Sequence, residues 1–283
     1  MAWASYRGAD GARRCDTLTR PFDSPGDARL KFDDYAQSYR FIKLERRDGI
    51  LQMTLHSDGA PLRWGLDAQA EMARALAEIG SDRDNRIIIL TGSGGEFSGP
   101  RLDPEAEFFH GAKLTPSGVH EVFVNARKLV NAHLAIEVPI IAAVNGPAKR
   151  HADLALMCDI VLASDDASFE DSAHFANGSI APGDGINVVY TMLIGLNRAR
   201  YLMLTGQVLG AREAKEMGLV AEVMPRDRLM PRAWELAHQL AKKSDMLLRY
   251  TRAVLTHPLK KQIDEGLPYY LAMEALSTLD RSQ

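Results

Sequence analysis

The chain has 283 residues, of which 46% are hydrophobic and 25% charged, and its formal net charge is -3. The length suits one large α/β domain with a small appendage, and the charge balance offers no basic excess for the phosphates of nucleic acid. No apolar run reaches the roughly 20 residues of a membrane span, and Cys15 and Cys158 suggest no disulfide framework. We therefore expect a cytoplasmic protein whose partners include neither nucleic acid nor membrane.

The first third of the sequence predicts an extension, a hairpin and a helix. Residues 1–35 are rich in Gly, Asp, Arg and Pro without regular periodicity, which indicates an extension on the surface or without fixed structure. Residues 41–56 form two apolar runs around Asp48-Gly49 and predict two strands joined by a turn. Apolar side chains at helical spacing predict a helix over 67–79.

The middle of the chain predicts short buried strands and a long helix. Three compact runs rich in Ile and Val are too short for helices and predict strands, at 87–90, 140–144 and 160–163. Residues 119–134 carry the apolar stripe of an amphipathic helix. Residues 36–230 are therefore expected to form an α/β core.

The rest of the chain predicts mostly helices. The core is expected to end with a loop entering a helix, a short helix stopped by Gly218 and a small strand, at 183–195, 211–217 and 219–223. Pro231 suits the first turn of a helix, and further helical stretches follow at 247–255 and 267–279. We expect residues 231–283 to form a C-terminal helical domain.

Two motifs follow the predicted strands. The stretch Asn145–Ser164, NGPAKRHADLALMCDIVLAS, resembles the signature of the crotonase (enoyl-CoA hydratase/isomerase) superfamily, and Glu96–Asp103, EFSGPRLD, resembles its partner loop. Similar segments extend from Phe41 to the end of the chain. The resemblance implies an α/β fold, a spiral of ββα units with a C-terminal helical region, and usually a trimeric assembly.

Two replacements distinguish the chain from the CoA-using members of that superfamily. In those members a run of glycines supplies a backbone N–H that holds the thioester oxygen together with an N–H of the partner loop. Here residues 149–151, Lys-Arg-His, replace the glycines. The partner loop reads Ser98-Gly99-Pro100, and Pro100 has no N–H to donate. The usual thioester oxyanion hole is therefore not expected.

These replacements resemble the 6-oxocamphor hydrolase type of β-diketone hydrolase. That type has a Trp after the first hairpin, two His, an Asp in PGDG and a Glu in a helix of the form LAxEAL, matched here by Trp64, His151, His174, Asp184 and Glu274. It also carries a His soon after the Trp, where this chain has Gln69, which cannot act as a base. The resemblance implies hydrolysis of a carbon–carbon bond in a β-diketone, a retro-Claisen cleavage.

The chemistry fits these side chains. His174 is expected to be the base that takes a proton from the attacking water, because imidazole titrates near neutral pH, and Asp184 to hold its other ring nitrogen. His151 and the indole N–H of Trp64 are expected to polarise the attacked carbonyl. Glu274 is expected to position the water or to return a proton to the enolate carbon.

Substrate contacts are expected from Trp64, Gly99 and Gln69. The other histidines show no metal-ligand spacing, and neither HExxH nor CxxC occurs, so no metal and no cofactor is predicted. Each site residue also has an ordinary explanation: a Trp as a core anchor, a His as a satisfied buried residue, an Asp between glycines as a turn residue, a Glu on a helix surface. Their joint occurrence favours a site.

Two alternatives remain open. An acyl-CoA hydratase or isomerase would use Asp153, at the position of that group's catalytic glutamate, with Arg63, Lys149 and Arg150 near the phosphates of CoA. The second alternative is an inactive crotonase homologue kept for assembly or binding. The resemblance favours a small-molecule diketone as the partner of the site and a homotrimer or a dimer of trimers as the assembly.

Overall fold

The computed structural model describes residues 30–99 and 115–281. In these residues a six-stranded sheet has the order β1-β2-β3-β4-β5-β8, with an antiparallel first pair and parallel neighbours thereafter. Its strands are β1 (Ile42–Arg47), β2 (Ile50–Leu55), β3 (Ile87–Gly92), β4 (Ile140–Val144), β5 (Ile160–Ser164) and β8 (Glu222–Met224). A small antiparallel pair is formed by β6 (Ser168–Phe169) and β7 (Leu209–Gly210).

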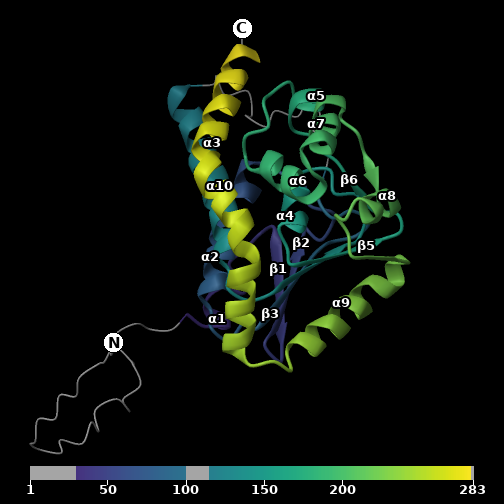
Figure 1. Cartoon of the computed structure of the whole chain (residues 1–283). Helices are drawn as coiled ribbons and strands as arrows, with labels where there is room; N and C mark the ends of the chain where they lie inside the picture. The colour runs from purple at the N-terminus through teal and green to yellow at the C-terminus, as the bar shows by residue number, and fades with distance from the viewer. Residues whose placement is uncertain (1–29, 100–114, 282–283) are drawn as a thin grey trace, which may run out of the picture.

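Helices surround the sheet (Figure 1). They are α1 (Phe32–Tyr35), α2 (Leu66–Ser81), α3 (Pro116–Ala135), α4 (Asp153–Leu156), α5 (Phe175–Gly178), α6 (Ile186–Ile194), α7 (Leu196–Thr205), α8 (Ala211–Glu216), α9 (Arg226–Leu240) and α10 (Asp245–Arg281). The long α10, drawn in yellow, packs against α3 and α6. Within the described ranges no helix is long and apolar enough to cross a membrane.

The predicted strands are confirmed. Asp48 and Gly49 turn the hairpin with φ of 53° and 76°, the positive values that a tight two-residue hairpin turn requires. The buried runs predicted at 87–90, 140–144 and 160–163 become β3, β4 and β5. The last strand differs in its boundary, because β8 begins at Glu222.

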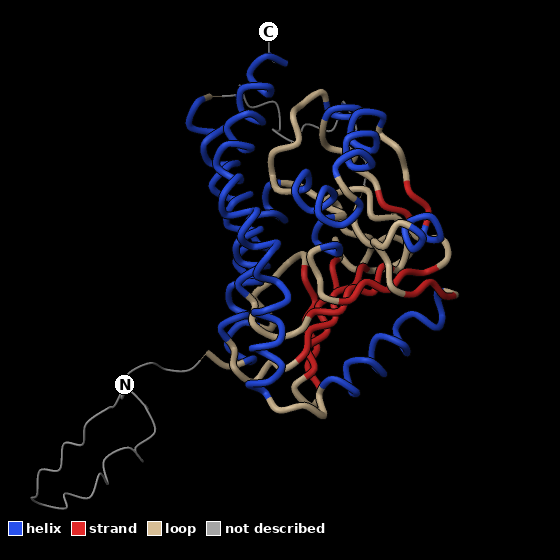
Figure 2. The backbone as a smooth tube through the Cα atoms, viewed as in Figure 1, coloured by secondary structure: helices blue, strands red, loops and turns tan. Residues whose placement is uncertain are grey.

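The two faces of the sheet bury separate apolar layers. Successive side chains of a strand point to opposite faces, so Leu51 and Met53 pack in the cluster that contains α2 and α3, whereas Ile50 packs in the cluster that contains Ala233 and Ala237 of α9. Figure 2 shows the sheet between α9 and the remaining helices. The sheet is thus covered on both faces, as its nearly uninterrupted apolar strands require.

Backbone hydrogen bonds also join the loops that follow the strands. The N–H of Trp64 donates to the Gly99 carbonyl over 2.8 Å, that of Lys149 to Ser98 over 2.8 Å, and that of Ala148 to Ser168 over 2.7 Å. Each turn of the chain therefore lays a short extended segment against the preceding one, beyond the ends of the main strands. The expected spiral of ββα units with a C-terminal helical region is confirmed.

The two C-terminal helices differ from their predicted boundaries. The helix expected to begin at Pro231 begins at Arg226, so the expected domain boundary lies inside α9. The two stretches expected at 247–255 and 267–279 are one helix, α10, which continues through Pro258 and Pro268. Proline removes a helix hydrogen bond, but packing of buried side chains holds α10 to the core, namely Ile263, Leu267 and Leu271.

The N-terminal extension lies outside the described residues as far as residue 29. Its last part, residues 30–35, includes α1, and Tyr35 is buried in the core. The Tyr35 hydroxyl donates to Asp82 over 2.8 Å and accepts from the Asn85 amide over 3.0 Å. The packed part of the chain therefore begins before residue 36.

Candidate active site

The loops at the carboxyl ends of the parallel strands bring four predicted site residues to one edge of the sheet. Trp64 lies between β2 and α2, Gly99 follows β3, His151 follows β4, and His174 follows β5 and β6. In open α/β sheets, this is the edge where ligands bind. The hydrogen bonds between successive loops hold these residues in register.

Two further site residues lie just before α6 and on α10. Asp184 precedes α6 and accepts from the Ile186 backbone N–H over 3.2 Å, and Glu274 lies on α10. Gly183 allows the two to approach, because a Cβ at this position would lie 2.3 Å from the Tyr270 carbonyl oxygen and 2.7 Å from the Cβ of Glu274. The PGDG loop therefore needs a glycine to lie directly on α10.

His174 stands among three carboxylates. Its side chain is buried, with the residue 2% exposed, and its Nδ1 donates to Asp171 Oδ1 over 2.8 Å. Its Nε2 lies 3.7 Å from Asp184 Oδ2 and 3.8 Å from Glu274 Oε1. The expected Asp184 partner is thus on the other side of the ring, and Asp171 holds Nδ1. Sequence reasoning did not assign Asp171 to the site. The sequence feature that could have identified it is a carboxylate three residues before the His, in the stretch FEDSAHF.

The carboxylates set the protonation of this group. Burial alone would lower the pKa of His174, but the charges of Asp171 and Asp184 raise it well above its ordinary value. Burial, together with the charge of Asp184, raises the pKa of Glu274, although His174 acts in the opposite direction. His174 therefore holds its second ring proton more tightly than an exposed imidazole does.

Arg150 is the buried cation of the site. The residue is 5% exposed, and although burial lowers the pKa of its guanidinium, four carboxylates act to raise it, those of Asp184, Asp171, Asp153 and Glu274. The Ser98 hydroxyl donates to the Arg150 carbonyl oxygen, which ties the two loops together. Arg150 therefore belongs to the interior charge network, whereas the acyl-CoA alternative would place it near the phosphates of CoA.

Trp64 and His151 form a tilted ring contact. Their ring centroids lie 4.2 Å apart with an interplanar angle of 39°. His151 Nδ1 lies 3.5 Å from Asp153 Oδ1 and 3.7 Å from Asp184 Oδ2. The His151 backbone has a φ of 48°, in the left-handed region that is uncommon for residues other than glycine.

Three buried polar atoms of the site have no hydrogen-bond partner among the described residues: Trp64 Nε1, Asp153 Oδ1 and Glu274 Oε2. Buried polar atoms are normally paired. The indole donor and the two carboxylate acceptors are thus the atoms of these three site residues that no described residue satisfies.

Gly99 and Gln69, the remaining predicted residues, donate no hydrogen bond to the other predicted site residues among the described residues. The Gly99 N–H donates to the Leu62 carbonyl oxygen over 3.1 Å, so it is already engaged. Gln69 is buried in α2, and within the part of the chain that the structure describes its side chain bonds to none of the other predicted site residues. Pro100 lies outside the described residues. The predicted substrate contacts of Gly99 and Gln69 therefore remain predictions.

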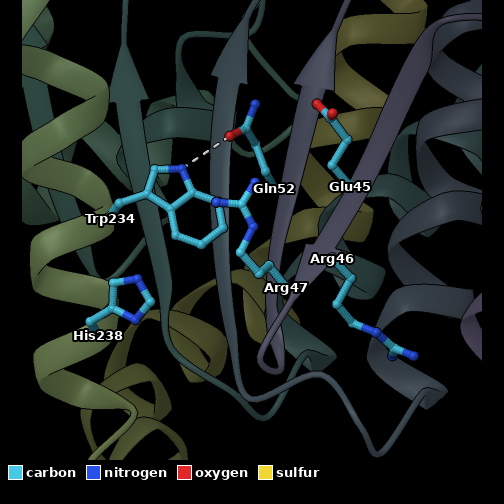
Figure 3. Close-up of a pocket in the computed structure, with 6 residues that line it drawn as sticks. All are labelled: Glu45, Arg46, Arg47, Gln52, Trp234 and His238. Atoms are coloured by element: carbon cyan, nitrogen blue, oxygen red, sulfur yellow. Dashed lines mark hydrogen bonds between the residues drawn. The ribbon is translucent and has the colours of Figure 1, made fainter.

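A separate pocket lies on the face of the sheet that α9 covers (Figure 3). It has a volume of about 260 Å³ and is lined by Glu45, Arg46, Arg47, Gln52, Trp234 and His238. The Trp234 indole N–H donates to Gln52 Oε1 over 3.1 Å across it. It shares no residue with the candidate site. The described residues contain no group of three or more His, Cys, Asp or Glu placed to hold a metal ion.

Known proteins resemble both the fold and the site-bearing segments. The enoyl-CoA hydratase/isomerase family model matches residues 45–276. A Mycobacterium bovis protein named "Probable enoyl-CoA hydratase echA8" is 30% identical over 250 residues, which cover 87% of this chain and 93% of that protein.

Two solved structures extend the comparison. ABDH, a β-diketone hydrolase from the cyanobacterium Anabaena sp. PCC 7120 bound to (S)-3-oxocyclohexyl acetic acid, superposes with a TM-score of 0.83 and 37% identity, covering 88% of this chain and 98% of that one. An enoyl-CoA hydratase/isomerase from Mycobacterium paratuberculosis shares the fold, with a TM-score of 0.72 and 24% identity over 84% of this chain and 94% of that one. With its signature motifs, its spiral of ββα units and these matches, the chain belongs to the enoyl-CoA hydratase/isomerase (crotonase) family.

Proposed function

We propose that this protein hydrolyses a carbon–carbon bond in a β-diketone. The observation that carries the proposal is the orientation of His174, whose Nδ1 is held by Asp171 while Nε2 faces Asp184 and Glu274. The Trp64–His151 ring pair adjoins this group, because His151 also approaches Asp184. This arrangement supports His174 as the base of the proposed reaction and the Trp64–His151 pair as donors to the carbonyl oxygen.

The geometry suits activation of water. The distances of 3.7 Å and 3.8 Å from His174 Nε2 to the two carboxylates exceed a direct hydrogen bond, so neither carboxylate occupies the Nε2 lone pair. In the proposed reaction His174 Nε2 takes a proton from a water molecule while the water oxygen bonds to one carbonyl carbon. Asp184 and Glu274 orient the water.

Bond cleavage follows from the tetrahedral intermediate. Its oxyanion re-forms a C=O double bond, and the carbon–carbon bond breaks with its electron pair going to the enolate of the second carbonyl. The proton on His174, or one from Glu274, then returns to the enolate carbon, so one water is consumed and a keto acid is formed. Indole and imidazole N–H donors from Trp64 and His151 would stabilise the oxyanion, and such donors are commonly worth about 2.7–4 kcal/mol each.

The comparisons include proteins named for the proposed hydrolase activity and proteins named for the acyl-CoA alternative. ABDH, named as a β-diketone hydrolase, matches nearly the whole described chain, whereas curated relatives are named enoyl-CoA hydratases. The site itself favours the hydrolase. Lys149 pairs with Glu96, Arg150 is buried among carboxylates, and the Gly99 N–H is engaged by Leu62. Fewer cations and backbone donors are thus left for a CoA thioester.

The free energy needed to bury the charged groups of the site disfavours an inactive homologue. An imidazole, a guanidinium and several carboxylates are buried together, and burying charges costs free energy unless each is well paired. Strongly perturbed groups of this kind are concentrated at functional sites. Their retention therefore supports a catalytic role.

The direct test is turnover of a panel of cyclic and acyclic 1,3-diketones, followed by loss of enol absorbance or by product analysis, beside hydration of crotonyl-CoA. We expect hydrolysis of at least one diketone and no hydration of the thioester. Hydration of crotonyl-CoA without diketone turnover would establish the alternative. Absence of both activities, with folded protein, would favour the non-catalytic homologue.

We also propose that the protein assembles as a homotrimer or a dimer of trimers, as the family resemblance implies. Large apolar side chains are exposed along α7 and α10, among them Tyr201, Leu204, Tyr250, Val254 and Leu255. Exposed apolar surface of this kind often marks an interface. Light scattering after size-exclusion chromatography would give the mass of the particle.

A further inference from the structure

We infer that Asp171 is a positioning residue for His174, the group that fixes the imidazole so that Nε2 faces the reacting atoms. The effect of Asp171 on catalysis rests on the proposed hydrolase function. Its effect on the tautomer and the pKa of His174 can be tested without any substrate. Sequence reasoning gave this role to Asp184, whose Oδ2 lies 3.7 Å from the other nitrogen of the ring.

The Asp171 carboxylate is itself held in place by the backbone around it. Its Oδ1 accepts from the N–H groups of Ala173 over 3.1 Å and His174 over 3.2 Å, in addition to the His174 ring. The Asn177 amide donates to the Asp171 carbonyl oxygen over 2.9 Å. The residue is buried. A carboxylate with this many donors has little freedom to turn, so the ring it accepts from is also oriented.

The contact determines the tautomer of the imidazole. An ionised carboxylate only accepts hydrogen bonds, so the nitrogen at 2.8 Å from Asp171 must carry the proton. When His174 loses one proton it is then left with Nδ1–H and a free lone pair on Nε2. That lone pair faces Asp184 and Glu274, where the water is proposed to lie.

The groups that face His174 act together on its charge. Asp171 is on its own segment, Asp184 precedes α6, and Glu274 is on α10. Arg150, from the loop after β4, interacts with all three carboxylates. The Tyr190 hydroxyl of α6 is buried, and the charge of Asp171 is among the causes that raise its pKa. Asp171 differs from the other carboxylates because it alone lies within hydrogen-bond distance of the His174 ring among the described residues.

The first experiment uses the wild-type protein. Ring ¹⁵N chemical shifts of His174, identified by loss of its signals in His174→Asn, report which nitrogen carries the proton as the pH is raised. We expect the Nδ1–H form for the neutral ring. A neutral ring protonated on Nε2 would overturn the inference, whether or not any variant folds.

The second experiment compares Asp171→Asn with Asp166→Asn. Asparagine keeps an oxygen acceptor but removes the charge, so the pKa of His174 should fall by about 1–3 pH units. Asp166 is half-exposed and pairs with Arg226 at the surface, so its substitution should leave the pKa of His174 unchanged. An unchanged pKa in a folded Asp171→Asn protein would contradict the inference.

The catalytic readout separates the inference from the proposed function. For a diketone that the wild type hydrolyses, Asp171→Asn should lower kcat by about 10²–10⁴-fold, with KM nearly unchanged, and should move the acidic limb of the pH–rate profile to lower pH. Asp171→Glu keeps the charge and should keep the limb near its wild-type position while kcat falls. If the wild type hydrolyses no diketone, the proposed function fails, and the ¹⁵N shifts and the pKa of His174 still decide the inference.

Discussion

The indole of Trp64 lies against the imidazole of His151 with ring centroids 4.2 Å apart and the rings tilted by 39°, and the Trp64 N–H has no hydrogen-bond partner among the described residues. A contact between two aromatic rings does not need the N–H. The packing role of Trp64 and its proposed role as a donor can therefore be separated by mutation.

Trp64→Phe should keep the ring contact with His151 and remove the donor. We expect kcat on a hydrolysed diketone to fall by about 10²–10³-fold, as for loss of one oxyanion donor, with little change in the free energy of unfolding. Trp234→Phe is the matched control, because its N–H bonds to Gln52 on the face of the sheet that α9 covers. The control should lose about 0.5–1.5 kcal/mol of stability and keep its activity. Full activity of Trp64→Phe would exclude the indole as a donor.

Gly183→Ala should disturb the contact between the PGDG loop and α10. The added Cβ would meet the Tyr270 carbonyl oxygen and the Cβ of Glu274, and overpacking of this kind costs about 1–3 kcal/mol. We expect a lower urea midpoint and a lower kcat, because Asp184 and Glu274 move apart. Gly210→Ala is the control, since no atom lies within 4 Å of its added Cβ. Equal stability of the two variants would show that the close approach is not required.

The pH–rate profile tests the protonation of His174. A base must be neutral, and the carboxylates around His174 raise its pKa well above the ordinary value of 6.5. We therefore expect kcat/KM to rise with pH along a limb centred above pH 6.5. A rate that falls over the same range would show that the proton on His174 is needed, which would make it an acid.

The same raised pKa has the opposite consequence for stability. The folded protein binds this proton more tightly than the unfolded chain, so the stabilisation is fully present below the ordinary pKa of His174 and is lost as the pH rises through the raised value. Urea unfolding across this range should show the loss in the wild type. In His174→Asn the corresponding slope should be absent.

Glu274→Gln should lower the activity of the protein and raise its stability relative to the wild type. Burial and the charge of Asp184 raise the pKa of Glu274, so the unfolded chain loses this proton at lower pH than the folded protein, and stability falls as the pH rises between the two values. Glutamine cannot ionise, and the stability advantage of the variant should therefore grow with pH. We expect kcat to fall by about 10²–10⁴-fold.

The control for that experiment is Glu265→Gln on the same helix. Glu265 is exposed and pairs with Lys261, so the substitution should change neither activity nor the pH dependence of stability appreciably. A Glu274→Gln protein that is less stable than the wild type at every pH would show that the carboxylate is fully paired in the folded state.

The local pattern of the sequence predicted the elements of the core well. Apolar runs such as Ile140–Val144 are too short for a helix, and Asp48-Gly49 suits a hairpin turn, so strands and turn could be predicted from neighbouring residues alone. The rules failed at α10, where two prolines lie inside one helix. There the packing of α10 against side chains distant in sequence outweighs the tendency of proline to end a helix, and a local sequence pattern gives no information about that packing.

The motifs determined the family and the residues worth considering, because a signature is a property of the chain itself. Only the tertiary structure decided which of these residues meet. Asp171 and Asp184 are both near His174 in sequence, but the backbone turn at 171–174 gives Nδ1 to Asp171, and the approach of the PGDG loop to α10 leaves Asp184 and Glu274 facing Nε2. Likewise, the sequence shows Arg150 as one more basic residue of a loop, and the fold buries it among four carboxylates. Charge networks of this kind depend on distances between segments far apart in the chain, and those distances exist only once the core has packed.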